Sequence, residues 1–133
     1  MEHNRKLVHV TRLPIRWGDM DALGHVNNTV YFRYMEQARI EWFEALGLSL
    51  QPGGEGPLII NASCTFLKPM VYPATVELRT YVDSPGRSSV QSHVRLSIGG
   101  ELYAEGAAKI VWTNGDGKSA PIPDELRAAL QAG

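Results

Sequence analysis

The residues best suited to do chemistry lie between positions 17 and 28, where Asp19, Asp21 and His25 occur among glycines and asparagines. This segment precedes a long helical pattern. Free N–H groups in a helix's first turn, at the positive end of its dipole, can polarise a carbonyl oxygen. A carboxylate just upstream, such as Asp21, could attack the carbonyl carbon or deprotonate a water molecule. The pattern therefore suits acyl chemistry at the helix N-terminus.

The same residues also have a purely structural interpretation. Aspartate and asparagine ahead of a helix usually cap it or form turns, because their side chains bind nearby backbone N–H groups. A lone histidine such as His25 is more often hydrogen-bonded structure than a catalyst. The pattern by itself leaves capping and catalysis both open for Asp21.

Other reactive residue types form weaker patterns. Cys64 lies within a strand pattern, which is typical of a small buried hydrophobe. The four histidines lack metal-ligand spacing and a single cysteine allows no CxxC, so we expect no metal site. Arg87, Ser88 and Ser89 could hold phosphates through a guanidinium and hydroxyls, or could form an ordinary polar turn.

The element expected to position the acyl chemistry is a helix over about 28–46. Its apolar residues recur at three- and four-residue steps: Tyr31, Tyr34, Met35, Ala38, Trp42 and Ala45. Asn27 and Asn28 are candidate N-caps, and Gly47 is placed to end the helix. Such a helix is about 28 Å long and spans a domain of this size.

Strands are predicted on both sides of this helix. The first covers 8–17, with Leu13, Ile15 and Trp17 on one face. The others are expected at 58–67, 76–82, 90–98 and 102–112, and a short helix at 124–131. Tight turns between strands exclude parallel crossovers, so the fold class is α+β with an antiparallel sheet curled around a central helix.

Composition sets further limits. The chain has 133 residues, 44% hydrophobic, with a formal net charge of −1, which favours a single domain over 1–133. We expect no nucleic-acid partner, because no basic excess exists. We also expect no membrane association and a cytoplasmic location, because one cysteine suits a reducing compartment and no run of about 18 apolar residues occurs.

The segment 18–31 resembles the motif of the hotdog-fold acyl-CoA thioesterases, in the branch of 4-hydroxybenzoyl-CoA thioesterase. The matching string is Asp-x-Asp-x-x-Gly-His-Val-Asn-Asn, residues 19–28. The similarity extends over roughly 8–114, including the helix and the segments 66–69 and 86–90. It implies a five-stranded antiparallel sheet wrapped around a long central helix, and hydrolysis of an acyl-CoA to a free acid and coenzyme A.

The resemblance also implies roles for individual residues. Asp21 matches the family's catalytic carboxylate, acting as nucleophile or general base, and the backbone N–H near Asn28 matches its carbonyl-polarising donor. His25 matches the motif histidine and could orient Asp21 or water. Substrate contacts are expected from seven further residues: Asn27, Tyr31, Asn61, Ser63, Arg87, Ser88 and Ser89.

An assembly follows from the resemblance as well. Hotdog domains pair into dimers, often dimers of dimers, with active sites at the subunit boundary. Asn61 and Ser63 of one chain would then face Asp21 of the other, and the coenzyme phosphates would lie near Arg87. No metal or resident cofactor is implied, since coenzyme A is part of the substrate.

Two other functions stay open. One is a hotdog hydratase acting on enoyl or 3-hydroxyacyl thioesters, although such members typically carry Asp-x-Asn-Pro-x-His, whereas Asp21 and His25 are four apart with no Asn-Pro. The other is a non-catalytic module that binds acyl thioesters, which would be indifferent to Asp21→Asn.

Overall fold

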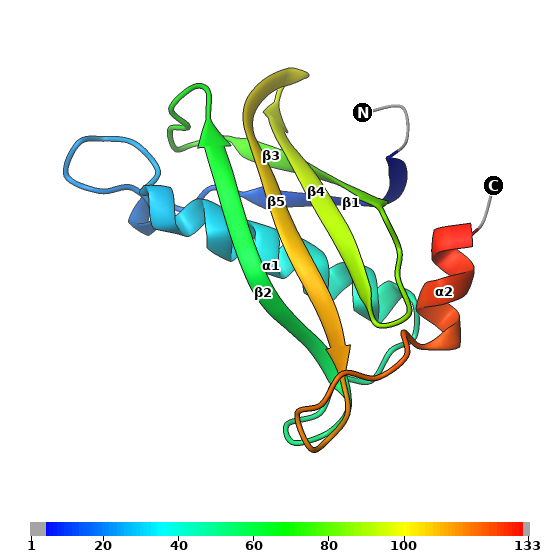
Figure 1. Ribbon diagram of the computed structural model, residues 1–133. Coiled ribbons are helices and arrows are strands. Elements are labelled where there is room, and N and C mark those ends of the chain that lie inside the picture. The colour runs from blue at the N-terminus through cyan, green and yellow to red at the C-terminus, as the bar shows by residue number, and fades with distance from the viewer. Residues whose placement is uncertain (1–4, 132–133) are drawn as a thin grey trace.

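The computed structural model describes residues 5–131, in which one antiparallel sheet curves along one side of a long helix (Figure 1). The strands are β1 (Lys6–Pro14), β2 (Gly56–Phe66), β3 (Thr75–Asp83), β4 (Ser89–Ile98) and β5 (Glu101–Thr113). The helices are α1 (Asn28–Ala45) and α2 (Asp124–Gln131), and a single 3-10 turn covers Trp17–Asp19. The predicted α+β architecture is confirmed.

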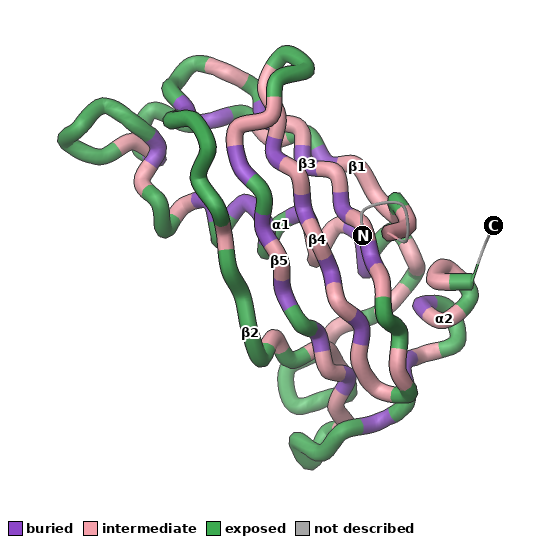
Figure 2. The backbone as a smooth tube through the Cα atoms, turned by 45° about the horizontal axis from the view of Figure 1, so that its top comes forward, coloured by how far each residue is buried: buried purple, intermediate pink, exposed green. Residues whose placement is uncertain are grey.

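The strands lie in the order β1-β3-β4-β5-β2, so β1 and β2 form the two edges. A two-glycine turn joins β4 to β5, with φ of +59° at Gly99 and +83° at Gly100, the left-handed values that a tight hairpin requires. The edge strand β2 is exposed along most of its length (Figure 2). Two of its apolar side chains, Leu58 and Ile60, are more than half exposed, at 53% and 54%.

The core is divided along α1 into two clusters. Near the N-terminus of the helix, Tyr31, Tyr34 and Met35 pack against the sheet. Near its C-terminus, Trp42 and Phe43 pack with Trp112 of β5. Small residues on the inner face of β5 let the helix approach closely, and a Cβ at Gly106 would overlap the sulfur atom of Met35.

Two predicted features differ from the structure. Ala45 is exposed and Phe43 is buried instead, because the larger ring stacks on Trp42 and meets Trp112 edge-on. The first strand ends at Pro14 rather than Trp17, because Trp17 opens the 3-10 turn and is 74% exposed. The first difference depends on tertiary contacts of Phe43, which override a local pattern.

The C-terminus of α1 is closed as predicted by Gly47, which has a φ of +81°. The Gly47 amide donates to the Glu44 carbonyl at 2.9 Å, and the Leu48 amide donates to the Phe43 carbonyl at 3.1 Å. These two bonds form a Schellman motif, which satisfies carbonyls that a helix end otherwise leaves free. Among residues 5–131, no helix is long and apolar enough to cross a membrane.

Candidate active site

Asp19 fixes the loop that leads into α1. Its side chain is buried, and its Oδ2 accepts hydrogen bonds from the Tyr34 hydroxyl at 2.6 Å and the Arg16 amide at 2.9 Å. Its own carbonyl accepts from the Asn27 amide at 3.0 Å. Burial alone would raise the pKa of Asp19, but the bonds from Tyr34 and Arg16 and the charge of Arg16 together hold it below its usual value. The first aspartate of the motif is therefore structural.

The loop turns back on itself around the second aspartate. The Asp21 amide donates to the His25 carbonyl at 2.9 Å, and the Gly24 amide donates to the Asp21 carbonyl at 3.0 Å. Gly24 has a φ of +83°, which favours glycine at this turn. The amide of the next core residue, Val26, donates to Met70 at 2.8 Å. The hydrogen bond from Val26 therefore connects the end of this turn to the segment that contains Met70.

The Asp21 carboxylate is exposed and has two neighbours. Its Oδ1 accepts from the Leu23 amide at 2.9 Å, and its Oδ2 accepts from the Asn27 side-chain amide at 3.1 Å. The first contact is the local turn bond that the structural interpretation predicts. The second links the carboxylate to the residue that caps α1. Asp21 thus shapes the turn while its carboxylate stays open to solvent.

Asn27 is the N-cap of α1. Its Oδ1 accepts from the Thr29 amide at 2.9 Å and from the Thr29 hydroxyl at 2.5 Å, while its NH₂ group donates to Asp21. The Asn28 amide N–H, the first of the helix, donates to no group in residues 5–131. A free donor at the positive end of an 18-residue helix can stabilise negative charge on a carbonyl oxygen.

A cavity of about 330 Å³ lies next to this donor. It is lined by His25, Asn28 and Tyr31 on one side and by the segment 66–69 on the other. Tyr31 is itself 2% exposed, and its hydroxyl accepts from the Met70 amide at 3.3 Å. The His25 imidazole makes no hydrogen bond within residues 5–131. The side chain that contacts the Asp21 carboxylate is that of Asn27 rather than that of His25.

Arg87, Ser88 and Ser89 lie at the opposite end of α1. The Ser88 carbonyl accepts from the amide of Trp112, which packs near the helix C-terminus. Arg127 of α2 donates to the carbonyl of Arg87 at 3.2 Å, and the Arg87 side chain is exposed. Since α1 spans about 27 Å, one chain does not bring this turn to Asp21.

The predicted contacts on β2 are also apart from Asp21. Asn61 pairs with Lys109 and Ser63 pairs with Ala107 across the β2–β5 ladder, and both are exposed. The alternating residues of β2, such as Cys64, pack on the core beside α1, which places Ser63 on the other face. Burial raises the pKa of the Cys64 thiol to about 11, which disfavours the thiolate form that a cysteine nucleophile needs.

Sequence reasoning missed the Asp19–Tyr34 hydrogen bond and the double role of Asn27. A signal for the first exists, because Tyr34 lies on the buried helix face and a buried tyrosine hydroxyl needs a partner. No spacing rule predicts the second, since the Asn27 contact to Asp21 depends on how the glycine turn closes. Within residues 5–131 no group of three metal-ligating side chains exists.

The chain is similar in sequence and in structure to known proteins. Residues 15–130 match the family described as the thioesterase-like superfamily. The PA2801 protein of Pseudomonas aeruginosa, named a candidate thioesterase, is 45% identical, with a TM-score of 0.90 over 94% of this chain and 99% of that one. These likenesses confirm the expected hotdog fold.

Two further similarities are more distant. BH1999, named a gentisyl-coenzyme A thioesterase, is 28% identical, with a TM-score of 0.83 over 90% of this chain and 99% of that one. YsmA of Bacillus subtilis (strain 168) is 29% identical over 123 residues, which is 90% of this chain and 82% of that protein. The likeness therefore extends over nearly the whole length of each chain.

Proposed function

Because the chain belongs to the thioesterase-like superfamily, we propose that it is an acyl-CoA thioesterase that releases a free acid and coenzyme A. The observation that carries this proposal is the link through Asn27 between an exposed carboxylate, Asp21, and the free amide of Asn28. Similarity to a gentisyl-coenzyme A thioesterase supports a coenzyme A ester as substrate. The motif at 19–28 is the basis on which we propose the 4-hydroxybenzoyl-CoA thioesterase branch.

In the proposed reaction, the thioester oxygen accepts a hydrogen bond from the Asn28 N–H, which stabilises the negative charge that develops on it. Asp21 either removes a proton from the attacking water or attacks the acyl carbon itself. The carbon–sulfur bond then breaks and coenzyme A leaves as a thiolate, which takes up a proton. After direct attack, water hydrolyses the acyl–Asp21 anhydride and restores the carboxylate. His25, at the nearby cavity, is proposed to orient the water.

A homodimer or homotetramer is part of this proposal. The phosphate site proposed at Arg87–Ser89 and the carboxylate of Asp21 lie at opposite ends of α1 in one chain. A second copy paired along the exposed edge of β2 would bring Asn61 and Ser63 of one chain to the Asp21 region of the other. The coenzyme is then held by both chains as substrate, and no resident cofactor is proposed.

The test is thiol release from a panel of acyl-CoA esters by the wild type and by Asp21→Asn. We expect the variant to lose about 100-fold or more in kcat, because a positioned acid–base group contributes on this scale. Asp116→Asn is the matched control, since Asp116 is exposed in a distant turn. Equal rates for wild type and Asp21→Asn would remove Asp21 from the reaction.

The same panel separates the alternatives. If folded wild-type protein releases no thiol from any ester, hydrolysis is excluded. Hydration of an enoyl thioester, followed by loss of ultraviolet absorbance, would then identify a hydratase. Binding of the esters without either reaction would identify a binding module.

A further inference from the structure

A second cavity of about 330 Å³ lies between α1 and the sheet. Its wall on α1 runs from Thr29 to Arg39, and Thr29 is hydrogen-bonded to Asn27, the residue that contacts Asp21. One end of this cavity, which we call the α1–sheet cavity, therefore lies two hydrogen bonds from Asp21, and the cavity extends from there along the helix. A volume of this size suits a small ligand or the acyl part of a larger one.

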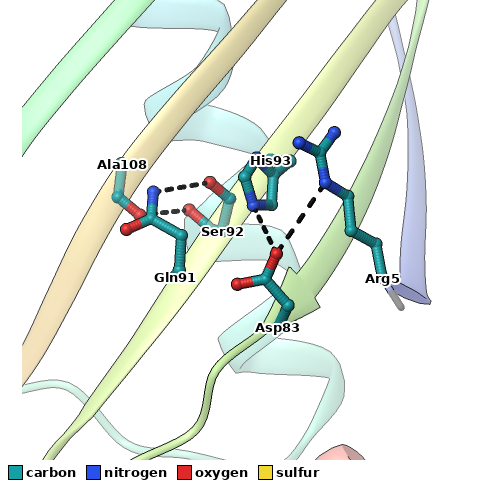
Figure 3. A network of polar contacts seen from close by, with 6 residues as sticks. All are labelled: Arg5, Asp83, Gln91, Ser92, His93 and Ala108. Atoms are coloured by element: carbon teal, nitrogen blue, oxygen red, sulfur yellow. Dashed lines mark hydrogen bonds and ion pairs between the residues drawn. The ribbon is translucent and has the colours of Figure 1, made fainter. Parts of the chain in front are cut away.

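The strands contribute small, uncharged side chains to the α1–sheet cavity, including Ala62, Ser92 and Ala108. The Ser92 hydroxyl donates to the Ala108 carbonyl at 3.0 Å, whereas the next residue, His93, points to the other face of the sheet, where it meets Asp83 at 2.9 Å (Figure 3). Among residues 5–131, all charges that line the cavity therefore come from α1.

Those charges do not balance. The lining contains Arg33, Glu36 and Arg39, which leaves one net positive charge. Arg33 pairs with Glu36 at 3.8 Å. Arg39 is half-buried, and it forms no hydrogen bond or ion pair with any residue in 5–131. Burial lowers the pKa of Arg39, and the charge of Glu36 raises it only in part.

An unpaired guanidinium in a partly buried cavity favours an anionic ligand. Removing a charge from water is unfavourable unless a counter-charge with hydrogen bonds replaces the lost hydration. A carboxylate suits arginine best, because two parallel N–H···O bonds can form. Side chains on a helix lean toward its N-terminus, and for Arg39 this is the direction of the Asn28 amide.

We propose that Arg39 binds a carboxylate at the far end of the acyl group, so that the substrates are coenzyme A monothioesters of dicarboxylic acids. This inference rests on the proposed thioester hydrolysis at Asp21. Ten residues of helix separate Thr29 from Arg39, about 15 Å at the usual rise. The arginine side chain covers part of this length, which favours an acyl group of intermediate length over a long fatty chain.

The test compares suberyl-CoA with octanoyl-CoA, which have equally long acyl groups and differ in the terminal carboxylate. We expect wild-type kcat/KM to be about 10- to 100-fold higher for suberyl-CoA, the range for a charge-assisted hydrogen bond. The difference should reside mainly in KM, because the contact forms in the ground state as well as the transition state. Equal kcat/KM values would overturn the inference and leave thioester hydrolysis standing.

Variants of Arg39 test whether this residue causes the preference for suberyl-CoA. Arg39→Met should reduce the suberyl-to-octanoyl ratio to about one, and Arg39→Lys should retain part of it because the charge remains. Arg12→Met is the matched control, since Arg12 pairs with Glu77 on the opposite face of the sheet, and it should keep the wild-type ratio. An equal loss for both esters in Arg39→Met, or loss of the oligomer, would mean that Arg39 holds the coenzyme or a partner chain.

A binding measurement without turnover tests directly whether Arg39 binds the terminal carboxylate. Isothermal titration of the Asp21→Asn variant should show tighter binding of suberyl-CoA than of octanoyl-CoA, and the difference should disappear in Asp21→Asn/Arg39→Met. If no ester is hydrolysed by the wild type, the proposed function fails. A suberyl preference in the titration would still support an anion site at Arg39, and its absence would exclude one.

Discussion

The two ends of α1 differ in how their backbone groups are satisfied. At the C-terminus, a Schellman motif at Gly47 binds the last carbonyls, and α2 buries Leu126 in the same cluster as Trp42 and Trp112. At the N-terminus, Asn27 caps one amide and also contacts the exposed carboxylate of Asp21, while the Asn28 amide donates to no group in residues 5–131.

This difference shows how one helix can serve stability and chemistry at separate places. Buried aromatic rings and satisfied carbonyls stabilise the C-terminal end. The N-terminal end keeps a donor and a carboxylate that a purely structural helix start would not need. Substitutions at the two ends should therefore have different consequences, for stability at the C-terminal end and for catalysis at the N-terminal end.

Trp112→Ala should destabilise the protein most. Trp112 is 2% exposed, meets Phe43 edge-on and donates to Glu55 at 2.9 Å. Truncating a buried tryptophan costs about 3–5 kcal/mol. Chemical denaturation should show this loss, whereas Trp17→Ala, at a 74% exposed position, should stay within about 0.5 kcal/mol of wild type. Similar losses for both variants would contradict the distinction.

Asn28→Pro should remove the proposed donor and leave the helix intact. Proline is favoured at the first helical position, and Asn27 already has a φ of −61° and a ψ of 139°, which suit a residue before proline. Loss of one oxyanion donor costs about 100- to 1,000-fold in kcat. The matched variant Asn28→Ala keeps the N–H and should keep its kcat. A fully active, folded Asn28→Pro would exclude this amide as the donor.

Asp19→Asn should have the smallest effect, about 1.5–3 kcal/mol of stability, the usual contribution of a hydrogen bond to a charged group. Because folding lowers the pKa of Asp19 from 3.8, its stabilisation is present above that pH and is lost as the pH falls through the folded value. Denaturation of wild type and variant should therefore converge in acid. Asp116→Asn is the control, and a difference independent of pH would contradict the role given to the Asp19 charge.

Much of the fold follows from the sequence because its determinants are local. The 3.6-residue period predicts α1, Gly47 marks its end, and strand alternation with Gly99-Gly100 predicts a hairpin. Pro14 cannot donate to a strand ladder and is typical of an edge strand, which is where β1 lies, but the position of β2 at the other edge could not be predicted in this way. The strand pairings join segments distant in the chain, and several arrangements satisfy the same pattern of apolar residues.

The residues of the candidate site could be predicted from the sequence, but the contacts between them could not. Asp19 and Asp21 are the same residue type two positions apart, yet one is 7% exposed and bonded to Tyr34 while the other is exposed. Which aspartate is buried depends on where Tyr34 lies after α1 packs on the sheet. The unpaired charge of Arg39 likewise becomes visible only once Ala62 and Ala108 are placed opposite it.

The uncovered edge of β2 has a practical consequence for every measurement above. Eleven residues of strand with a free edge form a template for another strand, and the exposed Leu58 and Ile60 add apolar surface to it. The homodimer proposed above would form through this edge and would obey mass action, so the paired fraction would fall as the protein is diluted. Dilution would then change the fraction of paired chains during an assay. Rates measured at different protein concentrations can therefore be compared only when each enzyme concentration is stated.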